Sequence, residues 1–493
     1  MVPVPGRRWQ VGRAVNLCHR RHGKGSLSIR LPAEHWPRKD AFMPEQVVMT
    51  RRRVLSTAAA GAVAMAGRWG DHLLTEPPLL AAPYPFAQPR AINEAAARAA
   101  GIRKLASKHL TLYTDREPAP HIDELPEVFD QAVPQWCAYF GRDLGRLGSW
   151  HARGFLMRQR EPFVGSRLLP SDLPPFPHGY SRGSELWLYE QPSDYYRRHL
   201  LLHEGTHVFC ATVLGGCGPP WYMEGLAELL ATHRWHDAKL VLNYFPASRM
   251  EVPMWGRIKI VQDAVSRGEL KLVEDILSYD EQAHRRVEPY GWCWALAAFL
   301  DGHPRYQARF RQMVRQVRRP DFTDQFRRLF RKDWEELTEE WQVFAAELDY
   351  GTEIARVVMD FTAGRPLPDS GALITVAADR AWQNSGIRVE AGRRYRLRAS
   401  GRYQVAAWPR PWPCEPGGVS IRYHRGRPLG MLLAAIRSPR SAGRSAFLDP
   451  IPVGLGTTLV PSRTGTLFFR INDSHGSLRD NAGTLEVRVQ SAE

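Results

Sequence analysis

Two histidines four residues apart, in the sequence HEGTH at His203–His207, constrain this chain more than any other feature. The run YYRRHLLL before them lacks Pro and Gly, so a buried helix is expected there. A helix repeats every 3.6 residues, and both imidazoles therefore project from one face. That spacing suits zinc, and Glu204 lies beside the pair, where a carboxylate can act on a metal-bound water. The alternative is a structural helix with packed histidines.

A second motif follows a loop rich in Gly and Pro. The segment WYMEGLAE at Trp221–Glu228 resumes a helical pattern after GGCGPP at 215–220. Two helices joined by a tight loop can bring Glu224 back to the histidine pair. Catalytic zinc usually takes three protein ligands and leaves the fourth position to water or substrate. Glu224 is therefore the expected third ligand, and the pattern predicts a zinc hydrolase.

HExxH followed by a second helix with xEGxAE resembles the gluzincin zinc metallopeptidases, and more narrowly the bacterial secreted peptidase MA-like proteins. The resemblance includes ASKHLTLYTDREP at 106–118 and YGWCWALAAFL at 290–300, and it covers residues 106–348. It implies an α+β zincin-like metallopeptidase domain that is mostly helical. It also implies a role for each matching residue: His203, His207 and Glu224 as zinc ligands, and Glu204 as general base. The loop before Glu224 is slightly shorter than in the aminopeptidase gluzincins.

The resemblance leaves the supporting residues open. Gluzincins often use a Tyr or His from a later helix to stabilise the oxyanion, and Tyr290 is the candidate here, against a packed core tyrosine. His233 and His236 are the alternatives. Glu228 either orients a zinc histidine or is an ordinary surface glutamate. The segment SELWLYEQ at 184–191 has the pattern of a strand, and in gluzincins such a strand forms the edge along which a peptide lies.

The beginning of the chain carries an export pattern. TRRRVLS at 50–56 precedes a small apolar run that ends at Gly67, and together they resemble a twin-arginine signal peptide, expected at 49–67. The alternative is a basic helix with a chance arginine pair. Residues 1–48 fit no signal and no fold. They are expected to be a gene-model artefact or a disordered extension, with the true start at Met49 or Met43. The apolar run is too short to span a membrane. A periplasmic or extracellular protein without a transmembrane helix in its mature form is expected.

The charge distribution bears on partners. The formal net charge is +16, and the first 53 residues hold twelve Lys or Arg against three Asp or Glu, so seven of the net positive charges lie beyond them. These charges are scattered, and no module with interleaved aromatics resembles a nucleic-acid binder. We therefore expect no nucleic-acid partner and an anionic envelope or polysaccharide surface as the more natural neighbour.

The cysteines leave two interpretations open. Cys210 and Cys217 flank the loop between the two motif helices. A disulfide there could rigidify the loop, whereas two buried thiols would look identical in sequence. The absence of CxxC from the sequence makes a cysteine-based zinc site an unattractive alternative.

The sequence predicts two domains after the signal. Residues 91–350 are expected to form the metallopeptidase domain, 351–369 a linker, and 370–493 an all-β sandwich, because short alternating segments between Gly, Pro and Asp turns fill this last part. IRVEAGRRYRLRASG, GMLLAAI and GTLFFRINDSHGSLRDNAGTLEVRV resemble, in order and spacing, the PA-I type galactophilic lectins and galactose-binding-like domains.

That second resemblance implies a calcium site. Asp473, Asp480 and Asn481 match the loop in which those lectins hold Ca²⁺, and they offer side-chain oxygens of the kind that calcium prefers. In the family, sugar hydroxyls complete the shell, but the sugar-contacting residues do not map onto 402–413 and 420–428. The alternative is a hydrogen-bonded turn.

These patterns predict an exported zinc-dependent metallopeptidase that hydrolyses peptide bonds, with a C-terminal sandwich that binds glycan or calcium. The expected partners are a protein or peptide substrate and a cell-envelope glycan, and the expected cofactors are Zn²⁺ and, in the sandwich, Ca²⁺. The alternative is a non-catalytic, carbohydrate-binding envelope protein that keeps the zinc-peptidase fold as scaffold. A zinc hydrolase of a non-peptide amide or a cell-wall crosslink shares every residue with the first hypothesis.

Overall fold

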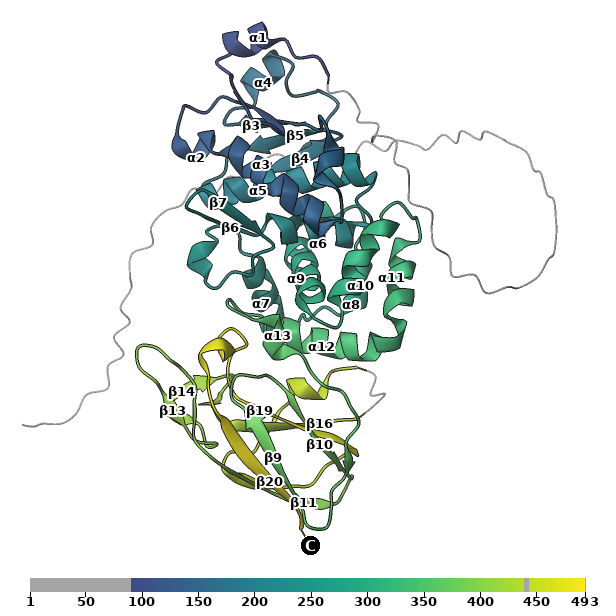
Figure 1. Cartoon of the computed structure of the whole chain (residues 1–493), viewed down its shortest axis with the longest axis vertical. Coiled ribbons are helices and arrows are strands. Elements are labelled where there is room, and N and C mark those ends of the chain that lie inside the picture. Colours follow the sequence, from purple (N-terminus) through teal and green to yellow (C-terminus); the bar gives the residue numbers. More distant parts are fainter. Residues whose placement is uncertain (1–89, 439–442, 493) are drawn as a thin grey trace, which may run out of the picture. The chain divides into compact units, whose positions relative to one another are not determined.

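The computed structural model describes residues 90–438 and 443–492, apart from the side chain of His284, and these belong to one compact unit, Leu79–Glu493. The chain combines helices with several β-sheets and ends in a strand-rich region (Figure 1). The expected extension at 1–48 and signal at 49–67 lie outside the described residues. Among the described helices, none has both the length and the apolar character needed to cross a membrane.

The first sheet has five strands in the order β1-β2-β3-β5-β4. Its strands are β1 (Arg103–Ala106), β2 (Leu110–Thr114), β3 (Ala152–Met157), β4 (Gly179–Arg182) and β5 (Glu185–Tyr189). β2, β3 and β5 are parallel, whereas β1 and β4 pair antiparallel at the two edges. The strand expected at 184–191 is therefore present as β5, but it lies inside the sheet. The expectation that it forms the edge is wrong, because the short strand β4 covers it.

Helices cover both faces of this sheet. α3 (Leu125–Tyr139) and α5 (Asp194–Phe209) pack on one face, and the short helices α1 (Glu94–Ala99) and α4 (Glu161–Gly165) lie on the other (Figure 1). Alternate residues of β5 show why, since Leu186 and Leu188 join the core under α3 and α5, whereas Trp187 joins the core under α1 and α4. A strand that is covered on both faces has apolar residues at nearly every position of its sequence.

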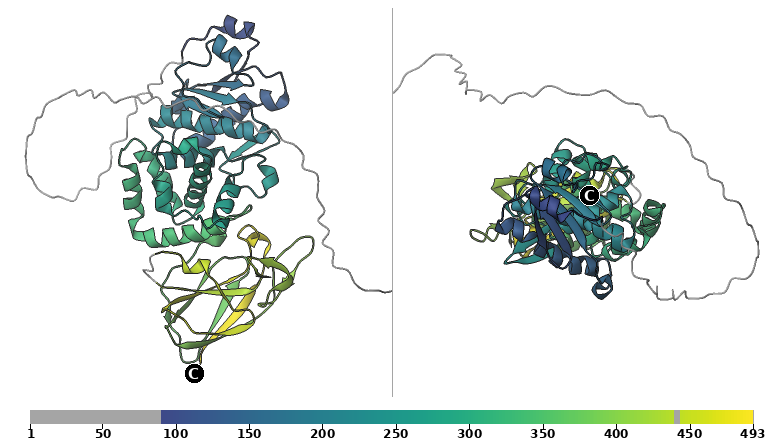
Figure 2. Two further views of the ribbon diagram at one scale, coloured as in Figure 1. Left: turned by 180° about the vertical axis from the view of Figure 1, so that it is seen from behind. Right: turned by 90° about the horizontal axis from the view of Figure 1, so that it is seen from above.

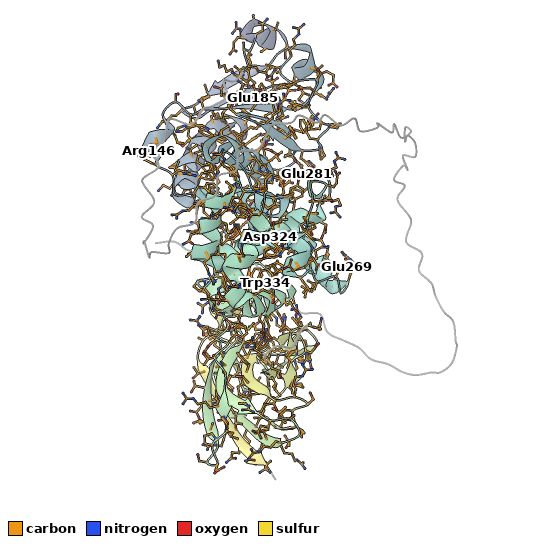
Figure 3. All side chains as sticks on the ribbon, turned by 90° about the vertical axis from the view of Figure 1, so that its right-hand side faces the viewer. Arg146, Glu185, Glu269, Glu281, Asp324 and Trp334 are labelled. Carbon is orange, nitrogen blue, oxygen red and sulfur yellow. The ribbon has the colours of Figure 1, made fainter. Side chains whose placement is uncertain are left out.

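A charged residue, Glu185, lies at the beginning of β5. Its carboxylate, labelled in Figure 3, accepts hydrogen bonds from Arg153 of β3 at 3.0 Å and from Arg90 at 3.0 Å. Its side chain is almost fully buried. The two guanidinium groups therefore compensate a carboxylate that would otherwise be costly to bury.

The two motif segments form consecutive helices. Ser193 caps α5 by accepting the amide of Tyr196, and a π-helical turn, η2 (Cys210–Leu214), follows the helix. After the Gly/Pro loop, α6 (Pro220–Ala231) begins with proline in its first turn, where the missing amide costs nothing. α6 packs against both α5 and α9 (Glu288–Gly302). The two motif helices, α5 and α6, are buried over most of their length, as the sequence predicts.

Several of the helices that follow in the chain pack around α9 (Figures 1 and 2). A hairpin of β6 (His233–His236) and β7 (Lys239–Leu242) follows α6. The helices are then α7 (Arg257–Ser266), α8 (Val273–Leu277), α10 (Gln307–Gln312), α11 (Phe322–Phe330) and α12 (Trp334–Ala346). α2 (Pro120–Asp123) precedes α3.

The C-terminal region holds two larger sheets with a shared apolar core. Their orders are β17-β16-β19-β10-β8 and β18-β11-β20-β9. The five-stranded sheet of this region contains β8 (Arg365–Pro366), β10 (Gln383–Val389), β16 (Leu432–Arg437), β17 (Ile451–Pro452) and β19 (Gly465–Ile471). The four-stranded sheet contains β9 (Ala372–Ala377), β11 (Arg394–Ser400), β18 (Gly456–Leu459) and β20 (Thr484–Ala492). Two short hairpins accompany them: β12 (Tyr403–Gln404) with β13 (Pro413–Cys414), and β14 (Val419–His424) with β15 (Arg427–Leu429).

The segment expected to be a linker, 351–369, is structured. It contains the short helix α13 (Ile354–Val357) and the strand β8, which pairs with β10. Met359 and Phe361 are buried in a cluster with Val343 of α12 and Trp382. This segment therefore contributes apolar contacts to the fold.

Gly205, inside the HEGTH motif, sits where α5 meets α3. A methyl group there would lie 2.7 Å from Cε2 of Phe129 and 2.8 Å from Cη2 of Trp136. We expect Gly205→Ala to lower the free energy of unfolding by about 1–3 kcal/mol, because overpacking outweighs the helix preference of alanine. Denaturant unfolding measures this. Gly165→Ala in α4 is the matched control, since nothing lies within 4 Å, and it should be neutral or stabilising. Equal effects of the two substitutions would contradict the packing account.

Candidate metal centre

Three side chains from the two motif helices converge. His203 and His207 of α5 and Glu224 of α6 each offer a ligand atom, and these atoms lie within 4.8 Å of one another. The two Nε2 atoms are 3.1 Å apart. Oε2 of Glu224 lies 3.3 Å from Nε2 of His203 and 3.7 Å from Nε2 of His207. The fold thus brings together the three residues that the sequence singled out.

This triangle has the dimensions of a zinc site. Ligands at 2.0–2.1 Å from zinc in a tetrahedron stand about 3.3 Å from one another. The three separations scatter around that value. Oε2 of Glu224 is buried and has no hydrogen-bond partner with ordinary geometry, although buried carboxylate oxygens are normally satisfied. Two imidazoles and one carboxylate with an unsatisfied oxygen therefore fit a zinc ion.

The electrostatics of the triangle favour a cation. Burial opposes ionisation of Glu224, but attraction from His207 and the close contact with His203 outweigh it and lower the pKa of the carboxyl to about 2. Burial likewise opposes protonation of His203, but its close contacts with Glu224 and Glu228 raise the pKa of its imidazole to about 9. The pKa of His207 is also raised, mainly by the charge of Glu224 against the effect of burial. Positive charge between these groups is therefore stabilised.

Glu204 lies beside the triangle and beneath the edge strand. A methyl group added to Gly179 of β4 would meet Oε1 of Glu204 at 2.5 Å, so the strand passes directly over this carboxyl group. Burial raises the pKa of Glu204, with the charges of His203 and His207 acting in the opposite direction. A carboxyl group with a raised pKa exchanges protons more readily near neutral pH. The arrangement therefore suits a general base.

Tyr290 opens α9 next to the same residues. Its ring centroid is 5.9 Å from that of His203, and the guanidinium carbon of Arg257 is 5.5 Å from its ring centroid. Burial and the charges of Glu224 and Glu204 raise the pKa of its phenol, which therefore keeps its proton. The structure thus places a hydroxyl donor in the neighbourhood of the triangle.

The two alternative histidines have other surroundings. His233 is buried and stacks on Tyr195 with centroids 4.5 Å apart, and its Nδ1 contacts the carbonyl of Ala231 at 2.8 Å. His236 is exposed in the β6–β7 hairpin and pairs with Asp237 at 3.0 Å. Neither belongs to a metal-capable group within the described residues.

Glu228 is not a surface glutamate. It is almost fully buried, and its Oε1 lies 3.4 Å from Nδ1 of His203. Its Oε2 lies 3.1 Å from Nε2 of His199, one turn before the motif. Arg257 donates to both oxygens, at 2.8 and 2.9 Å. Burial opposes the charge of Glu228, but Arg257 and His199 hold its pKa well below the usual range.

This network shows what the sequence interpretation missed. His199, His203 and Glu228 also form a group that could hold a metal. The guanidinium of Arg257 already supplies the positive charge there, so the group is better described as a charged support packed behind His203, with Oε1 of Glu228 3.4 Å from its Nδ1. His199 stands four residues before His203, a spacing that could have identified it. Arg257 carries no such local signal.

The thiols around the loop are free. Cys210 and Cys217 both appear as free cysteines, so the disulfide alternative is not formed in this structure. Cys217 Sγ lies 3.8 Å from the carbonyl oxygen of His207. Neither thiol is a member of the metal-capable groups within the described residues.

The residues proposed for calcium all belong to the segment between β19 and β20, and a hydrogen bond joins Asp473 to Asn481. Asp473 accepts the Asn481 side-chain amide at 3.0 Å and the Ser474 amide at 2.7 Å. One side-chain oxygen each of Asp480 and Asn481, both named Oδ1, is buried without a hydrogen-bond partner. Buried oxygens without a hydrogen-bond partner are compatible with a hard cation.

Comparison with known proteins adds little. No family model and no curated protein matches the chain. Among solved structures, a chain described as the EclA N-terminal domain, a PllA-like lectin, is similar with 24% sequence identity and a TM-score of 0.19. The match covers 24% of this chain and 95% of that one. A TM-score this low does not establish a shared fold.

The contact between Glu228 and Arg257 can be tested by substitution. Arg257→Gln leaves a buried carboxylate without its charged partner, so we expect a loss of about 3–5 kcal/mol in the free energy of unfolding. Arg267→Gln removes an arginine from an exposed pair with Glu269 and should leave the free energy of unfolding nearly unchanged. Denaturant unfolding of both variants measures the difference. Similar losses of stability in the two variants would contradict the role of Arg257. If Arg257 compensates Glu228, then Arg257→Gln should cost less stability in a chain that already carries Glu228→Gln, and an undiminished cost there would also contradict the role.

Proposed function

We propose that the chain is a zinc-dependent metallopeptidase of the gluzincin type, with His203, His207 and Glu224 as zinc ligands. The convergence of these three donors at the separations of a tetrahedral site is the observation that carries the proposal. Glu204, beside them, provides the base that a hydrolase requires. The sequence resemblance of residues 106–348 supports the same assignment.

The chemistry divides between the metal and the chain. A bound zinc ion supplies a water of lowered pKa and a Lewis acid for the substrate carbonyl. Glu204 accepts the proton of the attacking water and later delivers it to the leaving amine. Tyr290 donates its phenolic hydrogen to the oxygen that becomes negatively charged. Glu228 and Arg257 hold the His203 ring in place through its Nδ1.

The edge strand favours a peptide substrate. Among the described strands β4 pairs with β5 alone, so its other side presents main-chain donors and acceptors to an extended chain. Gly179 of this strand touches Glu204, and a peptide added along β4 would therefore run past the base. Hydrolysis of a non-peptide amide uses the same residues and is a different outcome of the substrate test.

The C-terminal sandwich and the export route complete the proposal. We propose that Asp473, Asp480 and Asn481 bind calcium and support glycan binding, because buried oxygens of the last two residues are unsatisfied. Export by the twin-arginine route to the periplasm or the exterior is proposed from residues 49–67 alone. A protein or peptide would then be the substrate and a cell-envelope glycan the partner.

The role of Glu204 predicts a separation of metal binding from turnover. In Glu204→Gln we expect the same zinc content as in the parent, one ion per chain, with hydrolysis reduced about 10²- to 10⁴-fold because proton transfer is lost. Zinc analysis together with cleavage of casein and a quenched-fluorescence peptide library measures both quantities. Glu269→Gln, on the exposed surface, is the matched control and should behave as the parent.

Each other outcome contradicts a specific part of the proposal. A parent protein without zinc would refute the metal centre. Zinc in the parent without hydrolysis of any peptide would favour the non-catalytic, carbohydrate-binding alternative. Full activity in Glu204→Gln would remove Glu204 from the mechanism.

The calcium assignment predicts ligand-linked stability. Calcium at about a hundred times its dissociation constant should stabilise the parent by about 2.7 kcal/mol, and Asp480→Ala should abolish the effect. Thermal unfolding with calcium or magnesium measures it, because magnesium fits such flexible oxygen sites poorly. Asp449→Ala, an exposed residue of the same region paired with Arg444, should keep the calcium response. An unchanged melting temperature of the parent in calcium would support the hydrogen-bonded turn instead.

A further inference from the structure

The outer face of the four-stranded sheet carries an open trough of about 790 Å³. The charged residues that line it are Arg396 and Arg398 of β11 and Glu486 and Arg488 of β20. Three arginines therefore face one carboxylate. We call this surface the arginine trough.

Strand alternation places these arginines on the surface. In β11 the residues Tyr395 and Leu397 are buried in the sandwich core, whereas Arg396 and Arg398, which alternate with them, are exposed. The same alternation holds in β20, where Arg488 is exposed. None of the three is required to fill the core.

The register brings two of the positive charges together. Arg398 stands directly opposite Arg488 in the antiparallel pair of β11 and β20. Like charges at directly opposed positions destabilise a sheet. Within the described residues, Arg396, Arg398 and Arg488 make no side-chain ion pair or hydrogen bond, whereas nearby Arg402 pairs with Glu415 at 3.0 Å. The sheet thus keeps an unfavourable contact that no ion pair among the described residues relieves, although Glu486 lines the same trough.

The uncharged residues that line the trough indicate which chemical class of ligand fits it. Ser400, Thr457, Thr458 and Gln490 offer hydrogen-bonding groups, and Glu486 can accept from hydroxyl donors. The residues that line the trough include no aromatic side chain, so it lacks the stacking surfaces on which single-stranded nucleic acids depend. A ligand with regular negative charges and many hydroxyl groups matches this lining.

We propose that the arginine trough binds a linear acidic polysaccharide. Arg396 and Arg398 are two residues apart and therefore stand about 6.8 Å apart along the strand. Each guanidinium can hold a carboxylate or sulfate through two parallel hydrogen bonds. Arg394 is exposed on the same strand and extends the row. This proposal does not depend on the metal centre or on the calcium loop, because it uses none of their residues.

Binding measurements on the full chain test the proposal. Polygalacturonate and dextran sulfate are the acidic probes, and neutral dextran is the uncharged one, at low salt where surface charges are least screened. We expect both acidic polymers to bind and dextran not to bind. The triple variant Arg396→Gln, Arg398→Gln, Arg488→Gln should lose about tenfold or more in affinity. The variant Glu204→Gln should bind as the parent does, which separates this test from that of the peptidase.

A charge-matched triple variant controls for net charge. Arg388, Arg422 and Arg463 are exposed in the same region and do not line the trough. Their replacement by Gln should leave the affinity within about twofold, because the removed charges lie outside the contact. Equal losses in the two triple variants would overturn the proposal in favour of non-specific attraction. Absence of binding to both acidic polymers would also overturn it.

Two further measurements distinguish polysaccharide binding from a structural role of the arginines and from a different anionic ligand. Arg398→Gln should leave the melting temperature unchanged or raise it, because it removes a like-charge contact. A clear fall would make the arginine structural and overturn the proposal. Tighter binding of oligo-dT or of phosphatidylglycerol vesicles, lost in the same triple variant, would assign the trough to a nucleic acid or a membrane and would overturn it as well.

Discussion

The buried carboxylate of Glu228 holds the centre of this structure together. It joins α6 to α5 through His199 and His203 and to α7 through Arg257. A buried carboxylate is tolerated only when its charge is matched and its oxygens are satisfied, and Arg257 provides both conditions. With Nδ1 of His203 directed to Glu228, its Nε2 faces His207 and Glu224. The shape of the candidate metal site therefore follows from a charge pair one layer behind it.

Residues related by helical spacing could be predicted from the sequence, whereas those joined by tertiary contacts could not. The pairing of His203 with His207 follows from one turn of helix, and the approach of Glu224 follows from two helices and a short loop. Arg257 belongs to a different helix with no periodic relation to the motif. The position of Gly179 over Glu204 escapes prediction for a different reason. β4 is four residues long and only partly buried, so its sequence GYSR carries little strand signal, and the apolar β5 is the stronger candidate for the edge.

The two proposed binding surfaces would act together with the metal centre. A chain that holds an acidic polymer through the arginine trough would keep its hydrolytic site near substrates embedded in the same polymer. Such tethering raises the effective concentration without new contacts to the substrate. The structured segment at 351–369, which packs Met359 and Phe361 against Trp382, limits the freedom that a flexible linker would give.

Zinc-edge X-ray absorption of the purified chain tests the central claim most directly, because it reports the ligand atoms themselves. The account predicts two imidazole nitrogens and oxygen ligands at about 2.0–2.2 Å, with no sulfur in the first coordination shell. Loss of one imidazole in His207→Ala would identify its source. A zinc–sulfur distance of about 2.3 Å would point to Cys217 or another thiol instead, and would contradict a centre built from His203, His207 and Glu224.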